Sequence, residues 1–328
     1  MTSLLAREML SAVGGPAPIF LGMEAGEPTT EARFHRARRG RRFRRSALLV
    51  IVVVAAAWFA INAYGCWYIA RNQASHHPQP TPATVGLDYQ DVHYAPGLSA
   101  WYIPASPARP VIVIVHGSGS NRSSPLTEAK GLHRRGYPLL LIELAYADGH
   151  RPYGGGQRET TEIRQAITYA NQTTGQPVVL LGYSLGGFDV AAAAAKGVNA
   201  AAVITDSGFV SFQTNAADHS PLPRQVFSLM APLYPLFSDG GHLVDVAQAA
   251  PAGYHLPTLV IQGTKDAMIA VHQARDLARI LHGELWLVPG VGHTATYAVM
   301  PTAYLDHVDA FINAATRLTT VGADRPKP

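Results

Sequence analysis

The chain has 328 residues, which is enough for one large domain and additional segments. It contains a single cysteine, Cys66, so an intramolecular disulfide and a zinc cluster built on cysteines are both excluded. The net charge is +4, but residues 1–45 hold nine arginines and four glutamates, whereas the remainder holds 17 basic and 18 acidic residues. The basic character is therefore local, and it does not indicate a protein that binds nucleic acid.

The N-terminal part of the chain has the composition of a tail followed by a membrane-spanning helix. Residues 1–45 mix Gly, Pro, Ala, Glu and Arg with little apolar periodicity, which predicts a disordered basic tail. Residues 46–70 contain no charged residue, and at 1.5 Å per residue they are long enough to cross a hydrocarbon layer of about 30 Å. Aromatic residues gather in the second half of this segment, as at a membrane interface. They are Trp58, Tyr64, Trp67 and Tyr68.

The arginines that precede the apolar segment predict its orientation. By the positive-inside rule the N-terminus is cytoplasmic, and the domain that follows is extracytoplasmic. A buried core helix and a cleaved signal sequence are alternatives, and Gly65-Cys66 has some likeness to the processing site of a lipoprotein, which leaves cleavage and lipidation at Cys66 open. Residues 71–86 are rich in proline and predict a semi-rigid linker.

Alternating strand and helix patterns then predict one α/β domain over residues 87–316, with a mostly parallel, doubly wound sheet. Two strands of a hairpin come first, and the later strands are short β-branched or leucine-rich runs, as in a sheet covered on both faces. Residues 207–254 have no clear strand and predict a short lid insertion around an apolar helical piece at 226–233. Residues 317–328 are predicted to be a flexible tail. The strands are expected at 88–94, 99–104, 111–115, 138–144, 178–181, 200–206, 258–262 and 285–288.

Residues with reactive side chains follow four of the predicted strands. The sequence Gly182-Tyr183-Ser184-Leu185-Gly186 lies between a strand and an alanine-rich helix, where a tight turn presents the serine hydroxyl. Asp266 lies in a Gly-Thr-Lys-Asp turn, His293 follows the last strand, and His116-Gly117-Ser118-Gly119 follows an earlier one. Because ligands bind at the carboxyl ends of parallel strands, these residues are expected to form one site.

With these motifs the chain resembles the α/β-hydrolase superfamily over about residues 88–316. The resemblance implies a nucleophile, acid and base in the order Ser184, Asp266 and His293, and an oxyanion hole formed by the backbone N–H groups of Ser118 and Leu185. In these roles Ser184 attacks a carbonyl, His293 accepts and returns the proton, and Asp266 orients the imidazole.

Alternatives for the acid and the base remain open in the sequence. Asp206 also ends a strand, and some hydrolases of this fold place the acid there. His272 and His307 are other histidines in the second half of the domain, but both fall inside predicted helices, which favours His293. His116 is expected to order its loop rather than to transfer protons.

The predicted function is that of a membrane-anchored serine hydrolase acting on a carboxylic ester or thioester, with no metal and no organic cofactor. A peptidase or amidase and a catalytically silent interaction protein of the same fold are the alternatives. The sequence has no His-Gly-Gly-Gly motif, and its anchored layout is similar to Bem46-like and dipeptidyl-peptidase-like hydrolases. A small-molecule or lipid-like acyl substrate is expected, and oligomeric state is not predicted. Apolar lid residues are expected to line an acyl pocket, namely Phe209, Phe212, Phe227, Leu229, Met230 and Leu233.

Overall fold

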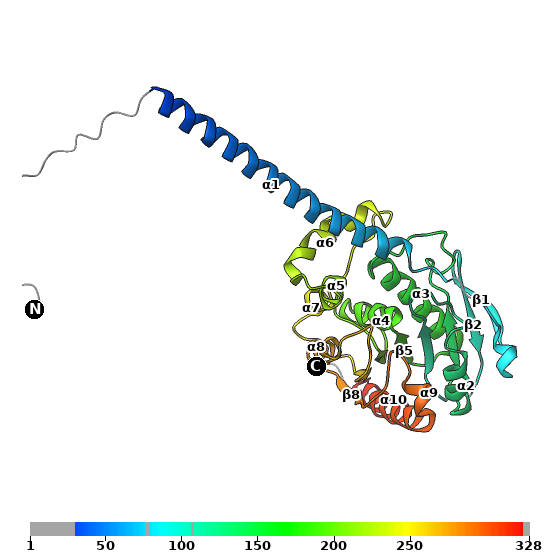
Figure 1. Cartoon of the computed structure of the whole chain (residues 1–328). Coiled ribbons are helices and arrows are strands. Elements are labelled where there is room, and N and C mark those ends of the chain that lie inside the picture. Colours follow the sequence, from blue (N-terminus) through cyan, green and yellow to red (C-terminus); the bar gives the residue numbers. More distant parts are fainter. Residues whose placement is uncertain (1–29, 76–78, 106–107, 324–328) are drawn as a thin grey trace, which may run out of the picture. The chain divides into compact units, whose positions relative to one another are not determined.

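The computed structural model describes residues 30–75, 79–105 and 108–323 of the chain (Figure 1). These residues fall into two compact units, residues 30–55 and the residues from Ala56 onward. The second unit contains one eight-stranded sheet with the strand order β1-β2-β4-β3-β5-β6-β7-β8. Its strands are β1 (Gln90–Ala95), β2 (Leu98–Ile103), β3 (Val111–Val115), β4 (Leu139–Ile142), β5 (Val178–Tyr183), β6 (Ala202–Asp206), β7 (Thr258–Gly263) and β8 (Glu284–Val288).

The sheet is mostly parallel, and the predicted hairpin forms its antiparallel edge. β1 pairs antiparallel with β2, and β2 pairs antiparallel with β4. The pairs from β4 through β3, β5, β6 and β7 to β8 are all parallel. The predicted fold class, a mostly parallel doubly wound sheet, is therefore confirmed.

The strand residues explain why both faces of the sheet are covered. In β3, Val111, Val113 and Val115 point into one core, whereas Ile112 and Ile114 point into a second core on the opposite face. This follows from the alternation of side chains along a strand, and it requires apolar residues at every position of a central strand. The first core is shared with α3 (Gln157–Thr174), α4 (Leu185–Ala195) and α8 (Val271–Ile280). The second core is shared with α2 (Leu126–Arg134) and α10 (Pro301–Ala323).

Short helices replace strands between β6 and β7, as predicted for the lid. We call residues 207–254 the lid. Its buried aromatic and aliphatic side chains pack on α4 and on the first core, and they include Phe209, Phe227 and Met230. The lid helices are α5 (Phe212–Asp218), η2 (Arg224–Leu229), α6 (Met230–Leu233), η3 (Tyr234–Leu236) and α7 (Val246–Ala249).

Two boundaries differ from the prediction. Helix α1 runs from Thr30 to Arg71, so residues 30–45 are helical rather than disordered. Arg, Ala and Glu are good helix formers, and extending an existing helix avoids the cost of a new nucleus, so the apolar helix continues back through the basic residues. Helix α10 likewise continues to Ala323, past the predicted end at residue 316. The remaining residues of the predicted tails, 1–29 and 324–328, lie outside the described residues.

One helical segment in the described chain is long and apolar enough to cross a membrane, Arg41–Arg71. An 18-residue window within it has a mean hydropathy of 2.3, and the side chains of Leu48 to Val54 are more than half exposed. The segment after it contains a short 3₁₀ helix, η1 (Pro82–Val85), in the predicted linker, of which residues 76–78 are not described. The length and composition of the segment Arg41–Arg71 agree with a membrane span.

Candidate active site

Ser184 lies in a strained turn between β5 and α4. Its backbone has φ 54° and ψ −115°, a conformation that non-glycine residues rarely adopt and that is found mostly at functional sites. The flanking positions have no room for a side chain, so both must be glycine. A Cβ on Gly182 would lie 2.1 Å from the carbonyl oxygen of Gly186, and a Cβ on Gly186 would lie 2.4 Å from that of His116. The Gly-x-Ser-x-Gly pattern is therefore a packing requirement of this turn.

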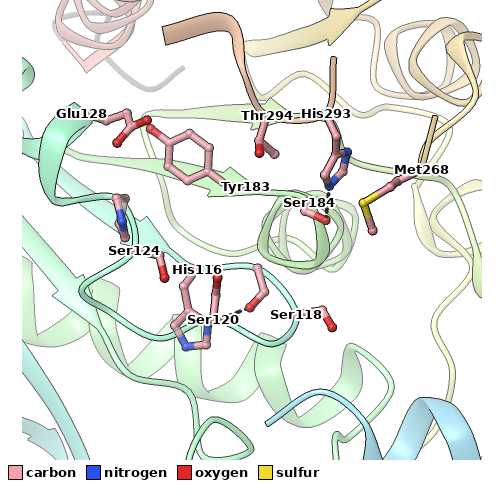
Figure 2. A pocket seen from close by; sticks show the side chains of 12 residues that line it. His116, Ser118, Ser120, Ser124, Glu128, Tyr183, Ser184, Met268, His293 and Thr294 are labelled. Atoms are coloured by element: carbon pink, nitrogen blue, oxygen red, sulfur yellow. Dashed lines mark hydrogen bonds between the residues drawn. The ribbon is translucent and has the colours of Figure 1, made fainter. Parts of the chain in front are cut away.

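The structure brings Ser184, His293 and Asp266 together in one hydrogen-bonded chain. Figure 2 shows the contact between Ser184 and His293. The Ser184 Oγ lies 2.8 Å from His293 Nε2, and His293 Nδ1 lies 2.8 Å from Asp266 Oδ2. Asp266 can only accept when it is ionised, so Nδ1–H donates to the carboxylate and Nε2 is left to accept from the serine hydroxyl. The three side chains come from the ends of β5, β7 and β8, as the sequence predicts.

The surroundings of Asp266 keep it ionised. Burial raises its pKa, but hydrogen bonds from His293 and from the backbone N–H groups of Ile269 and Met268 outweigh burial and lower the pKa to about 2. A further hydrogen bond comes from the side-chain amide of Gln262, 2.9 Å from Oδ2. The Asp266 side chain is 0% exposed and that of His293 is 18% exposed, so only the imidazole end of the pair is open.

Asp206, the alternative acid, is buried at the end of β6 without a hydrogen bond to His293. One carboxyl oxygen accepts from the Ser207 hydroxyl at 3.2 Å, and the other has no partner among the described residues. Its backbone carbonyl accepts from the N–H of Ser184 at 2.8 Å. Asp206 therefore supports the turn through its backbone, whereas its carboxyl group is set apart from the imidazole.

The buried carboxyl of Asp206 predicts a pH-dependent stability. Burial raises its pKa to about 7, against the opposing effects of the Ser207 hydrogen bond and the charge of His293. In the unfolded chain the pKa is about 3.9, so the native state holds the proton to higher pH. The contribution that the protonated carboxyl makes to the stability of the native state is fully present below about pH 4, and it is lost as the pH rises to about 7.

Asn cannot titrate, so the free energy of unfolding of Asp206→Asn relative to wild type is expected to rise between pH 5 and pH 8. The rise should be on the order of a few kcal/mol, since one pKa unit is about 1.4 kcal/mol. Thermal or denaturant unfolding of both proteins at the two pH values measures it. A difference that does not change with pH would contradict the assignment of a protonated Asp206.

The other histidines considered in the sequence contact groups other than Ser184. His272, on α8, lies 3.3 Å from the Asp218 carboxylate, and His307, on α10, is 2.7 Å from Glu284. Both lie in helices, as predicted. His116 is buried, donates from Nδ1 to the Gly117 carbonyl and accepts at Nε2 from the Leu144 N–H. Burial lowers its pKa to about 4, although the Gly117 hydrogen bond opposes this, so His116 is a neutral residue that holds its loop.

The residues predicted for the oxyanion hole flank the nucleophile. Leu185 is the first residue of α4, and the N–H groups in the first turn of a helix have no partner within the helix. Ser118 belongs to the loop after β3 and lines the same two cavities as Ser184. A Cβ on the adjacent Gly117 would lie 3.2 Å from the Ser184 Cβ, which shows how closely this loop approaches the serine.

Two cavities meet at Ser184, and they differ in character. One has a volume of about 270 Å³ and mixed walls, with polar side chains that include Ser120, Ser124 and Glu128 as well as His293 (Figure 2). Burial raises the pKa of Glu128, against a backbone hydrogen bond that lowers it. The other cavity has a volume of about 600 Å³ and mostly apolar walls. Met268 and Ser118 lie, like Ser184, at the junction of the two.

Of the six lid residues predicted to line an acyl pocket, four line the apolar cavity, Phe209, Phe212, Phe227 and Met230, whereas Leu229 and Leu233 do not. The ring of Phe209 stacks on Phe188 at 4.6 Å between centroids.

Another wall of the cavity was not predicted, and it comes from α1 through Ile61, Gly65 and Ile69. Their spacing of four residues places them on one face of the helix, but in a largely apolar segment this spacing does not stand out.

The described residues contain no group of three or more His, Cys, Asp or Glu side chains that could hold a metal ion. Cys66 is buried, and its Sγ lies 3.3 Å from the Met230 carbonyl, to which it donates. In this structure the thiol is therefore covered by the lid.

Comparison with known proteins gives matches at the level of structure. No family model and no curated protein sequence matches the chain. The esterase Pf2001 of Pyrococcus furiosus is similar with a TM-score of 0.60 and 18% identity, over 75% of this chain and 98% of its own. The esterase RhEst1 of a Rhodococcus species has a TM-score of 0.52 and 16% identity, over 69% and 99%.

A membrane phospholipase A, described as a bacterial virulence factor, has a TM-score of 0.50 and 16% identity, over 84% of this chain and 99% of its own. At these identities the likeness concerns the fold. The match covers nearly the whole length of each of these neighbours and most of this chain. The chain therefore has the α/β-hydrolase fold.

Proposed function

We propose that the protein is a membrane-anchored serine hydrolase that cleaves a carboxylic ester, with Ser184, His293 and Asp266 as its catalytic triad. The observation that carries the proposal is the position of His293, whose two ring nitrogens lie 2.8 Å from the serine hydroxyl and from the carboxylate. This is the geometry that a general base needs to activate a serine nucleophile. The esterases and the phospholipase among the structural neighbours support the same reaction class.

In the proposed reaction the Ser184 Oγ attacks the ester carbonyl while His293 Nε2 accepts the hydroxyl proton. The imidazolium then gives this proton to the leaving alcohol as the C–O bond breaks, which leaves an acyl group on Ser184. Water then attacks the acyl-enzyme with the same imidazole as base, the bond between the acyl carbon and Ser184 Oγ breaks as the imidazolium returns the proton to Oγ, and the carboxylic acid leaves. The N–H groups of Leu185 and Ser118 are assigned to the negative oxygen of each tetrahedral intermediate.

The two cavities support a division of the substrate between acyl group and alcohol. We assign the acyl group to the apolar cavity of about 600 Å³ and the leaving alcohol to the smaller cavity, whose walls carry more polar side chains. A pocket of this volume with apolar walls is typical of small-molecule ligand sites. The same triad would also act on a thioester, because the acyl-enzyme is identical and only the leaving group differs.

Anchoring by α1 with a cytoplasmic N-terminus is part of the proposal. The apolar segment, the six described arginines between Arg38 and Arg45 and the exposed aromatic residues near its other end support it. Protease treatment of sealed vesicles or spheroplasts tests the orientation. If protease cleaved the domain only from the cytoplasmic side, the orientation would be the opposite of the one proposed.

Hydrolysis of p-nitrophenyl esters of increasing acyl length tests the reaction class. We expect kcat/KM to rise from the acetate to the octanoate by about tenfold or more, since each buried CH₂ contributes about 0.8 kcal/mol. Peptide p-nitroanilides serve as the comparison and should be cleaved far more slowly. Hydrolysis of the anilides in preference to the esters would make the protein a peptidase or amidase, and no hydrolysis of either would remove the proposal.

A further inference from the structure

The last part of α1 is built into the hydrolase domain through the lid. The Trp58 indole N–H donates to the Val226 carbonyl at 2.7 Å, and the Asn62 amide donates to the same oxygen at 2.8 Å. One turn further along, the Cys66 thiol donates to the Met230 carbonyl. Cys66 and Asn62 are both fully buried. These contacts join residues more than 160 positions apart in the sequence, and an anchor that served only as a tether would not need them.

The chain that follows the helix supports the loop that carries the predicted oxyanion donor. The Gln73 carbonyl accepts from the Gly119 N–H at 2.9 Å, and the Ala70 carbonyl accepts from the Tyr153 N–H at 2.8 Å. Gln73 is buried and lines the apolar cavity beside Ser118. The end of the helix is therefore held against the active-site loop as well as against the lid.

Between these two attachments the helix forms a wall of the apolar cavity. Ile61, Gly65 and Ile69 face the cavity from α1, and Phe209 and Met230 face it from the lid. Gly65 lies beside the lid residue Met230, because a Cβ at this position would be in van der Waals contact with the Met230 Cε at 3.5 Å. Ser184 lines the same cavity. An acyl chain that fills the cavity thus meets both the helix and the nucleophile.

The position of Gly65 along the helix places this wall of the cavity at the membrane surface. A helix needs about 20 residues to cross the hydrocarbon layer, and counted from Ser46, the first residue after the arginines, such a segment ends at Gly65. Tyr64, Trp67 and Tyr68 are exposed around this level, as interfacial aromatics are.

We propose that the apolar cavity takes the acyl chain of a long-chain ester lipid directly from the bilayer that holds α1, and that the helix residues Ile61, Gly65 and Ile69 form part of the acyl-binding site. The proposal rests on the proposed esterase function and adds the substrate class and the route of entry. The anchor is then a component of substrate recognition, and the enzyme acts on lipids of its own membrane.

The first test places a larger side chain in the wall of the cavity that α1 forms. Gly65→Leu extends a side chain into the cavity, and Ala60→Leu is the matched control, because Ala60 is exposed on the same helix and does not line the cavity. The full chain is assayed in detergent with 4-methylumbelliferyl oleate and 4-methylumbelliferyl acetate. We expect the ratio of kcat/KM for oleate to that for acetate to fall about tenfold or more in Gly65→Leu and to match wild type in Ala60→Leu. An unchanged ratio in Gly65→Leu would overturn the proposal.

The second test needs no variant, and it decides the question if Gly65→Leu fails to fold. Wild-type protein is reconstituted in phosphatidylcholine vesicles, with 4-methylumbelliferyl oleate either in the same vesicles or in separate ones. Faster hydrolysis in the shared bilayer supports entry from the membrane, whereas equal rates would contradict it. Hydrolysis of 4-methylumbelliferyl acetate by the same vesicles distinguishes the esterase function from the route of substrate entry. If the vesicles did not hydrolyse the acetate, the esterase function itself would be refuted.

Discussion

Ser184→Ala is expected to lower kcat for p-nitrophenyl esters by about 10⁵-fold or more, the largest effect of any single substitution. The hydroxyl is the atom that forms the acyl-enzyme, and removal of a serine nucleophile from a triad leaves only the catalysis due to binding and the oxyanion donors. The hydroxyl makes its hydrogen bond to His293 at the open end of the triad, so the fold should be retained. Steady-state kinetics with the octanoate ester measures the loss.

Two comparisons make this result specific to the triad. His293→Ala combined with Ser184→Ala should be no worse than Ser184→Ala alone, because the two groups act as a unit. Ser228→Ala is the matched control, since Ser228 is exposed on the lid and lines neither cavity. Residual activity of Ser184→Ala within about tenfold of wild type would mean that another nucleophile performs the reaction.

Asp266→Asn is expected to lower kcat by about 10⁴-fold, whereas Asp206→Asn should change kcat by no more than about threefold. The Asp266 carboxylate accepts the Nδ1–H of His293 and stabilises the imidazolium, and an amide at this position favours the wrong tautomer. Asp206 makes no hydrogen bond to the imidazole, and burial raises its pKa to about 7, so an uncharged Asn closely replaces its protonated form. Kinetics of the two variants on one ester compare them directly.

The pair of variants is its own control, because each replaces a carboxyl by an amide at the end of a neighbouring strand. If Asp206→Asn proved the more damaging of the two, the acid would have to be reassigned. Equal losses would indicate that both carboxyl groups act on His293, for which the structure gives no direct hydrogen bond from Asp206.

Much of the fold could be predicted because the sheet is covered on both faces. A strand in that environment must be apolar at each position, so runs such as Val111–Val115 are visible in the sequence, and the turn at Ser184 is marked by glycines that the backbone requires. Ser184, Asp266 and His293 could be selected because each follows a strand, and parallel strands bring their carboxyl ends to one edge.

The choice between Asp266 and Asp206 could not be settled from the sequence, since both follow strands of the same sheet. It depends on the turn after β7, where two backbone N–H groups and the Gln262 amide aim Asp266 at the imidazole. The wall formed by α1 could not be predicted either. In a membrane-spanning segment most positions are apolar, so the face with Ile61, Gly65 and Ile69 does not stand out, and its contacts with the lid depend on tertiary structure alone.

Covalent labelling with a fluorophosphonate, mapped by mass spectrometry, tests the central proposal most directly. This reagent reacts with a serine that an adjacent base has activated. Wild-type protein should carry one adduct, on the peptide that contains Ser184, while Ser184→Ala carries none and His293→Ala is labelled much more slowly. Equal labelling of wild type and Ser184→Ala, or no labelling of wild type, would contradict the assignment of Ser184 as the nucleophile of a serine hydrolase.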